Sequence, residues 1–246
     1  MRTLIRLEIT RTLRNRKFMF FSVLYPAILF TVFAGSIGTD KKVDGLGITY
    51  VAYYMVAMAA FGAMTAVLMG NAERIARERE RGWVRQLRLT ALPGRGYVAA
   101  KIASAATVSL PSILIVLVIG AAAKDVRMAA WQWVALAFST WAGSLVFAAL
   151  GVAIGYLATA DAARPISMIC YFALAGLGGL WGPLTSWPHG VQQVLDYLPG
   201  RPYASLGQAI EAGNAPHAKD VTVLVVYLLL FAGAAAWLYR KDTRKA

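Results

Sequence analysis

The 246-residue sequence has few of the residues that support covalent or metal chemistry. Its one cysteine, Cys170, cannot form a disulfide within the chain. Its two histidines, His189 and His217, have no His or Cys nearby at the spacing of a metal site, and no HExxH segment occurs. The sequence therefore predicts no catalytic residue and no metal site.

A nucleotide-binding P-loop is also missing. This motif requires Gly-Lys followed by Ser or Thr, because the backbone and the lysine hold the phosphates while the hydroxyl binds magnesium. None of the eight lysines is followed by either hydroxyl residue. Any ATP that drives this protein must therefore be bound and hydrolysed by another subunit.

Charged residues make up only 15% of the chain, whereas 59% is apolar and the mean hydropathy is +0.56. This composition lies outside the range of soluble domains and indicates a membrane protein. A bilayer core of about 30 Å requires about 20 apolar residues per helix. Six segments meet that requirement, at residues 18–37, 51–70, 102–123, 131–160, 165–184 and 221–239.

The predicted spans contain no ionisable side chain in their interiors, since all twelve acids fall in loops, arms or span ends. Carriers that use an ion gradient usually keep such groups in the membrane despite their cost. The polar groups inside the spans are hydroxyls, which we interpret as contacts between helices. A self-sufficient channel or gradient-driven carrier is therefore the alternative rather than the leading hypothesis.

The basic residues predict the orientation. Six spans place both termini on one side of the membrane, and that side receives nineteen of the 25 Lys and Arg residues, against six on the other. Cytoplasmic loops carry such an excess, so both termini are predicted to be cytoplasmic. Because membrane orientation alone accounts for these charges, nucleic acid is not a predicted partner.

Pairs of glycines recur in the predicted fourth and fifth spans. Gly151 and Gly155 form one Gly-x-x-x-Gly pair, and Gly178 and Gly182 form another. Such pairs let two helix backbones approach closely. The contact can lie within the bundle or between two subunits.

One loop resembles a known family. The segment "ERERGWVRQLRLTALPGRGYVAAK" is similar to the cytoplasmic loop after the second span of type 2 ABC exporter permeases. The matching residues are Glu80, Arg81, Gly82, Gln86, Leu87, Thr90 and Lys101. Three more segments resemble the family in the same order along the chain: "TLRNRKFMFFSVLYPAILF", "GLGGLWGPL" and "VLDYLPGRPYASLGQAI".

This resemblance implies an all-α integral membrane protein with six transmembrane helices in a single domain. It implies an N-terminal amphipathic arm at residues 1–17, a cytoplasmic coupling helix within loop 71–101 and short external helices at residues 185–220. The implied partners are two copies of an ABC ATPase subunit, which bind the ATP and Mg, and a second permease subunit in a homodimer or heterodimer. The implied location is the bacterial inner membrane.

The same loop gives the candidate docking site for the ATPase. If residues 74–91 are helical, five arginines share one arc, and Trp83, Val84 and Leu87 lie on the adjoining arc. Anionic lipid suits the arginines, whereas the exposed apolar face needs a cover, either lipid or a groove on a partner. We favour the groove, so the predicted docking residues are Glu80, Arg81, Gly82, Trp83, Val84, Gln86, Leu87 and Thr90.

The resemblance also places a substrate pathway along the second and fifth spans. Large apolar residues there suit a hydrophobic or amphiphilic substrate, and they are equally ordinary in a packed bundle. The candidate pathway residues are Met58, Phe61, Met64, Phe172 and Trp181. The leading hypothesis is the permease of an ATP-driven exporter for a drug, an antibiotic or a lipid. The alternatives are a self-sufficient channel or carrier and a membrane anchor for a signalling partner.

Overall fold

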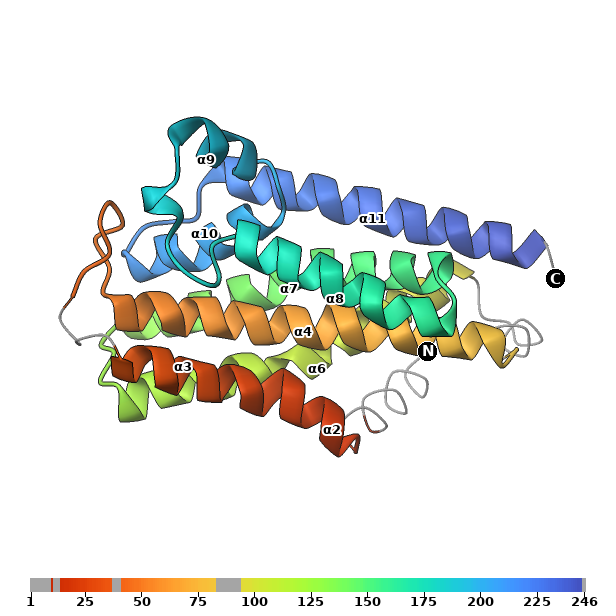
Figure 1. Cartoon of the computed structure of the whole chain (residues 1–246), viewed down its shortest axis with the longest axis horizontal. Coiled ribbons are helices and arrows are strands. Elements are labelled where there is room, and N and C mark those ends of the chain that lie inside the picture. Colours follow the sequence, from red (N-terminus) through yellow and green to blue (C-terminus); the bar gives the residue numbers. More distant parts are fainter. Residues whose placement is uncertain (1–9, 11–13, 37–40, 83–93, 245–246) are drawn as a thin grey trace.

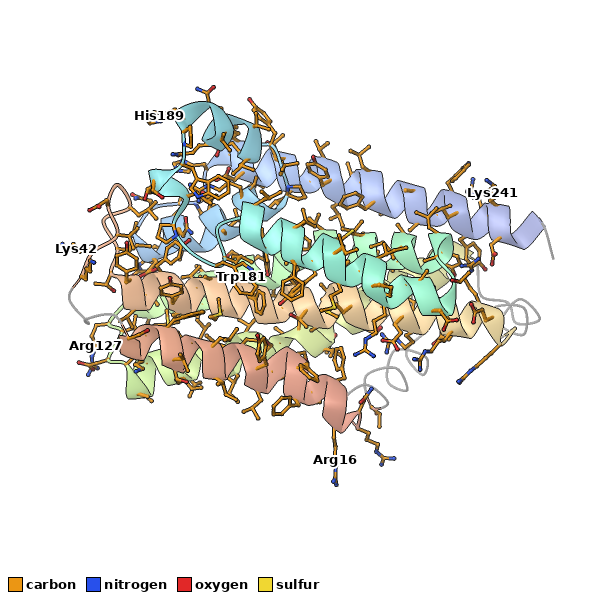
Figure 2. The ribbon with its side chains drawn as sticks, viewed as in Figure 1. Arg16, Lys42, Arg127, Trp181, His189 and Lys241 are labelled. Atoms are coloured by element: carbon orange, nitrogen blue, oxygen red, sulfur yellow. The ribbon has the colours of Figure 1, made fainter. Side chains whose placement is uncertain are left out.

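The computed structural model describes residues 10, 14–36, 41–82 and 94–244, which form an elongated helical bundle (Figure 1). The long helices alternate in direction along the bundle, so α4, α7 and α11 finish at the end where α6 and α8 begin. We call this the basic end, and it lies near Lys241 in Figure 2. At the opposite end, near Lys42, the chain turns back on itself and Lys42 pairs with Thr49 in an isolated antiparallel bridge, so we call this the hairpin end. The helices are α2 (Arg16–Met19), η1 (Phe20–Leu24), α3 (Tyr25–Ser36), α4 (Tyr50–Glu80), α6 (Gly94–Ala123), α7 (Ala130–Leu157), α8 (Ala160–Leu177), η2 (Leu184–Ser186), α9 (His189–Leu195), α10 (Gly200–Glu211) and α11 (Ala218–Arg244).

Helix α4 is the centre of the bundle, and α3, α6, α7, α8 and α10 pack around it. Every residue of segment 51–68 is buried. This segment is apolar on all sides, as expected for a helix without a solvent face. Its start is fixed by Thr49, whose hydroxyl accepts a hydrogen bond of 3.3 Å from the backbone N–H of Ala52.

Glycines allow α7 to pack closely against α4. A Cβ atom at Gly151 would lie 2.7 Å from the carbonyl oxygen of Leu68, and one at Gly155 would lie 2.7 Å from the Cβ of Ile75. No side chain fits in that space, because the nearest atoms are a backbone oxygen and a Cβ atom of α4, which cannot move aside. The first Gly-x-x-x-Gly pair therefore makes a contact within the bundle. In the second pair, Gly178 meets Gly200 at the start of α10, also within the chain.

The outer surface of the bundle is apolar. Large apolar side chains are exposed on α3, α6, α7, α8 and α11, including Val134 and Ile169, whose relative exposures are 71% and 70%. Soluble proteins rarely expose apolar surface on this scale. Four described helices are long and apolar enough to cross a membrane, within Tyr50–Glu80, Ala99–Ala123, Ala130–Leu157 and Ala218–Asp242. The described part of the chain is therefore built from helices, and its apolar surface and long apolar helices are those of a membrane protein.

The other two predicted spans are shorter helices. The apolar stretch Phe20–Ser36 is 17 residues long, and α8 has 18 residues. Helix α3 contains Pro26, which has no N–H to donate, and the π-helical turn η1 lies just before it. A membrane protein with six spans therefore remains a prediction.

Helix boundaries differ from those expected at the basic end. The sequence predicts a loop over residues 71–101, but α4 continues through Glu80 and α6 already begins at Gly94. Alanine, arginine and glutamate, which fill the end of α4, favour helix, and Arg77 forms a 2.6 Å ion pair with Glu73 one turn before it. The helix ends at Glu80 with Arg81 as its C-cap, and Gly82 follows with a φ of 71°, a conformation that suits glycine.

The fifth helix is also displaced from the predicted span. Residues 165–184 were expected to cross the membrane, whereas α8 covers Ala160–Leu177 and ends in a turn at Gly178 and Gly179. Likewise α7 ends at Leu157, three residues before the predicted end of the fourth span at residue 160. The turn between α7 and α8 sets the last residue of α7 and the first residue of α8. It does so through contacts with α4, which a hydropathy window does not record.

Short helices α9 and α10 precede α11 at the hairpin end, where the sequence predicts short helices (Figure 1). Helix α10 packs into the bundle rather than lying on it. Its Tyr203 is 2% exposed and donates a hydrogen bond of 3.0 Å to the carbonyl of Thr140 on α7. The amide of Gln132 donates to the carbonyls of Ile210, at 2.8 Å, and Glu211, at 3.1 Å, and so holds the end of α10.

Candidate functional site

The last turn of α4 connects the bundle to the segment predicted to bind the ATPase. Three predicted docking residues lie here: Glu80 ends the helix, Arg81 caps it and Gly82 turns the chain away. Arg81 is exposed. The other five predicted docking residues lie outside the described residues: Trp83, Val84, Gln86, Leu87 and Thr90.

Glu78 and Lys101 form a buried ion pair between α4 and α6. The Lys101 Nζ atom lies 2.8 Å from one carboxylate oxygen of Glu78 and 3.0 Å from the other. The two side chains are only 1% and 8% exposed. Two charges removed from water need such close contact to offset their lost hydration. The pair therefore fixes the start of α6 against the end of α4.

Arg79 joins α4 to α7 and α11. Its guanidinium forms two hydrogen bonds with the carboxylate of Asp242 on α11, at 2.9 and 3.3 Å. It also donates to the carbonyls of Gly155 and Ala158, at 3.0 and 3.2 Å, and lies 5.4 Å from the ring centre of Tyr156. Carbonyls at the C-terminal end of a helix lack partners within the helix, and a cation there is favourable. Arg79 thus caps α7.

Glu80 caps the next helix. Its carboxylate accepts a hydrogen bond of 2.7 Å from the backbone N–H of Ala160, the first residue of α8. Unpaired N–H groups and the helix dipole favour an acceptor with negative charge at this position. Consecutive residues of α4 therefore hold both sides of the turn between α7 and α8. We call Glu78, Arg79 and Glu80, with their partners, the α4 junction.

A groove extends from the α4 junction toward the middle of the bundle. It has a volume of about 1030 Å³ and lies between α4, α8 and the first helical segment α2–η1–α3. Its middle part is lined by Phe21, Tyr25, Phe61, Thr65, Met69, Met168, Tyr171 and Phe172. Its part at the basic end is lined by Glu73, Arg74, Arg77, Glu78, Arg81 and Arg164. The groove thus combines an apolar half with a cationic half.

The predicted pathway residues fall into two groups. Phe61, Phe172 and Trp181 form one aromatic cluster, because the ring centre of Trp181 lies 5.6 Å from that of Phe61 and 5.8 Å from that of Phe172. Phe61 and Phe172 line the groove, and Phe172 and Trp181 are each 41% exposed. Met58 and Met64 are buried in the core, with 2% and 0% exposure, and do not line it.

Sequence reasoning missed the roles of Glu78 and Arg79. The sequence marks Lys101 only as a position that matches the family. It does not reveal that Glu78, which precedes Lys101 by 23 residues, is its buried partner. One signal in the sequence pointed to these roles: acids and bases are interspersed at the end of α4. Membrane orientation explains the bases but not the acids between them. Across the described residues, no group of three or more His, Cys, Asp or Glu side chains is placed to bind a metal ion.

A central apolar helix, an apolar outer surface and charged residues gathered at one end define a helical membrane protein with a polar junction. The chain belongs to a family of transporters: a family model described as "ABC-2 family transporter protein" matches residues 34–238. It is also 28% identical over 235 residues to "Putative transport permease YvfS" of Bacillus subtilis (strain 168), covering 96% of this chain and 95% of that protein. The chain is therefore an ABC-2 type permease, the membrane subunit of an ABC transporter. Such subunits associate with an ABC ATPase subunit and generally have no ATPase site of their own.

Proposed function

We propose that this permease is half of an ATP-driven exporter that moves a hydrophobic or amphiphilic substrate outward across the bacterial inner membrane. Two copies of a separate ATPase subunit would bind ATP and Mg and supply the energy, since this chain has no P-loop. A second permease, identical or related, would complete the complex. The nineteen cations on the predicted inner side support cytoplasmic termini. Substrates consistent with this proposal are a drug, an antibiotic or a lipid.

The observation that carries this proposal is the α4 junction. Glu78 contacts α6, Arg79 contacts α7 and α11, and Glu80 contacts α8. A displacement applied where α4 ends would therefore reach four other helices through ion pairs and hydrogen bonds. Interfaces of this kind move as units rather than deforming gradually. The junction is thus suited to pass an ATPase movement to the groove.

The ATPase would dock on the segment that follows Gly82, with Trp83 and Leu87 as its apolar anchors. Buried aromatic and aliphatic anchors commonly dominate such interfaces. The test compares Trp83→Ala with Leu87→Asp against Arg81→Ala with Arg85→Ala, scored by co-purification of the ATPase with the membrane-inserted chain. We expect the apolar changes to release the ATPase and the arginine changes to retain most of it. If the arginine changes release it and the apolar changes are silent, the cationic face is the dock.

The substrate would pass along the α4 and α8 side of the groove. Phe61, Phe172 and Trp181 support this route, because they bring a buried and two half-exposed aromatic rings together beside it. Met58 and Met64 would contribute only through a rearrangement of the core. Export that continues with a disabled ATPase and stops when the proton gradient is removed would favour a gradient-driven carrier instead.

A further inference from the structure

The groove changes character along one face of α4. Phe61, Thr65, Met69, Glu73, Arg77 and Arg81 follow one another at four-residue intervals, and each lines the groove. At 1.5 Å per residue, the stretch 61–69 is about 12 Å long, and the charged stretch 73–81 is about the same. One leaflet of the hydrocarbon core is about 15 Å deep. The apolar half is therefore about one leaflet long.

Helix α8 repeats the same order on the opposite wall. Arg164 lies in its second turn at the basic end, and Met168, Tyr171 and Phe172 follow toward the middle of the bundle. Because α4 and α8 run in opposite directions, their charged residues meet at one end and their apolar residues meet along the middle. Both walls thus present cations to one end of a bound molecule and apolar surface to the rest.

The charges in the groove do not cancel. Its acids are engaged, since Glu73 pairs with Arg77 at 2.6 Å and Glu78 pairs with Lys101 at 2.8 Å. Arg81 and Arg164 form no ion pair with any residue in the described part of the chain. Guanidinium groups bind phosphate and carboxylate in a bidentate manner, which makes them effective receptors for an anionic headgroup.

We propose that this groove binds an amphiphile with an anionic phosphate headgroup and a long hydrocarbon chain. The headgroup would lie on Arg81 and Arg164, and the chain would extend over Met168 and Phe172 toward Phe61. A volume of about 1030 Å³ is at the upper end of small-molecule sites and accommodates such a lipid-like molecule. This inference rests on the proposed export function and specifies its substrate class.

The experiment measures binding of tritiated hexadecyl phosphate to the purified full chain in a neutral detergent, without the ATPase. The competitors are unlabelled hexadecyl phosphocholine, octyl phosphate and inorganic phosphate, which separate the charge of the headgroup, the length of the chain and the anion alone. We expect hexadecyl phosphate to bind at least about 10-fold more tightly than each competitor.

Two double variants separate the two halves of the groove. Arg81→Gln with Arg164→Gln should weaken hexadecyl phosphate at least about 10-fold and change hexadecyl phosphocholine less than about 2-fold. Met168→Ala with Phe172→Ala should remove most of the advantage of hexadecyl over octyl phosphate, because that advantage comes from apolar contact. Met168 and Phe172 are 46% and 41% exposed, so these changes leave the core intact. The matched control, Lys42→Gln with Lys241→Gln, removes two exposed charges outside the groove and should change each affinity less than about 2-fold.

Three results would overturn the proposal. Equal affinity for hexadecyl phosphate and hexadecyl phosphocholine would show that the headgroup charge is not recognised. An equal loss in the control variant would show general surface electrostatics, and equal competition by inorganic phosphate would show a simple anion site. Because the ATPase is absent, these outcomes do not depend on docking or transport. A chain that passes this test and fails to transport with its ATPase would contradict the proposed function alone.

Discussion

Replacing Lys101 by methionine tests how strongly the α4 junction holds the bundle together. The Lys101 Nζ atom contacts both carboxylate oxygens of Glu78, at 2.8 and 3.0 Å, and the lysine is 1% exposed. Methionine keeps much of the length and removes the charge, so a buried carboxylate loses its cation. Breaking a buried ion pair by removing one partner costs about 3–5 kcal/mol.

That cost is large enough to measure by heating. A soluble chain of 150–250 residues changes its melting temperature by about 2–4 °C per kcal/mol, so Lys101→Met should lower the midpoint by about 6–20 °C. The assay heats the full chain in detergent at one fixed rate and follows the soluble, monodisperse fraction, since unfolding is expected to be irreversible. Lys241→Met is the matched control, because Lys241 is exposed and should change the midpoint little.

The double variant gives the sharper result. In Glu78→Gln with Lys101→Met, neither side chain is ionised, so most of the lost stability should return, as for other buried ion pairs replaced as a unit. A single variant whose midpoint stays within about 2 °C of that of the unchanged chain would show that the ion pair does not stabilise the bundle. A double variant whose loss equals the sum of the two single losses would show that the two side chains are not coupled.

Further predictions concern four other sites. Arg79→Ala should cost about 1.5–3 kcal/mol and loosen α11, seen as faster proteolysis of the C-terminal segment, whereas unchanged proteolysis would contradict its role as a clamp. Gly151→Val should prevent stable accumulation, because its Cβ would meet the Leu68 carbonyl at 2.7 Å, and Gly176→Ala, with open space around it, should be tolerated. Burial raises the pKa of Glu211 from 4.5 to about 8, so between these values the folded chain keeps a proton that the unfolded chain releases, and stability falls as pH rises. Glu211→Gln should flatten this dependence. The gain in melting midpoint of the variant over the unchanged chain should therefore be larger at pH 8 than at pH 5. A reporter fused after residue 246 should be cytoplasmic and one inserted near Gly213 external; both on one side would contradict the six-span topology.

Hydropathy predicted the helices in their order because their apolar length is a local property of the sequence. The Gly-x-x-x-Gly pattern also predicted that Gly151 and Gly155 allow close packing, since two glycines four residues apart create a groove on any helix. The pattern alone does not show whether the close contact lies within the bundle or between two subunits. The answer depends on Leu68 and Ile75, about 80 residues earlier in the chain.

The ends of the helices were predicted less well, because they depend on contacts between distant segments. Glu80 fixes the first residue of α8, and Arg79 fixes the last carbonyls of α7. Both residues were assigned by sequence to a loop. The groove could not be predicted either, since Arg81 and Arg164 line the same groove only because α4 and α8 pack side by side in opposite directions. Docking through Trp83 and Leu87 stays a prediction.

The proposed role of this permease is to convert ATP hydrolysis on another subunit into movement of an amphiphile. The most direct measurement reconstitutes the full chain with its ATPase in liposomes and follows the movement of labelled hexadecyl phosphate into or out of the lumen. Movement should require ATP, stop when the P-loop lysine of the ATPase is replaced by alanine, and continue in the presence of a protonophore. Movement that survives the P-loop change and collapses with the protonophore would show a gradient-driven carrier and contradict ATP-driven transport.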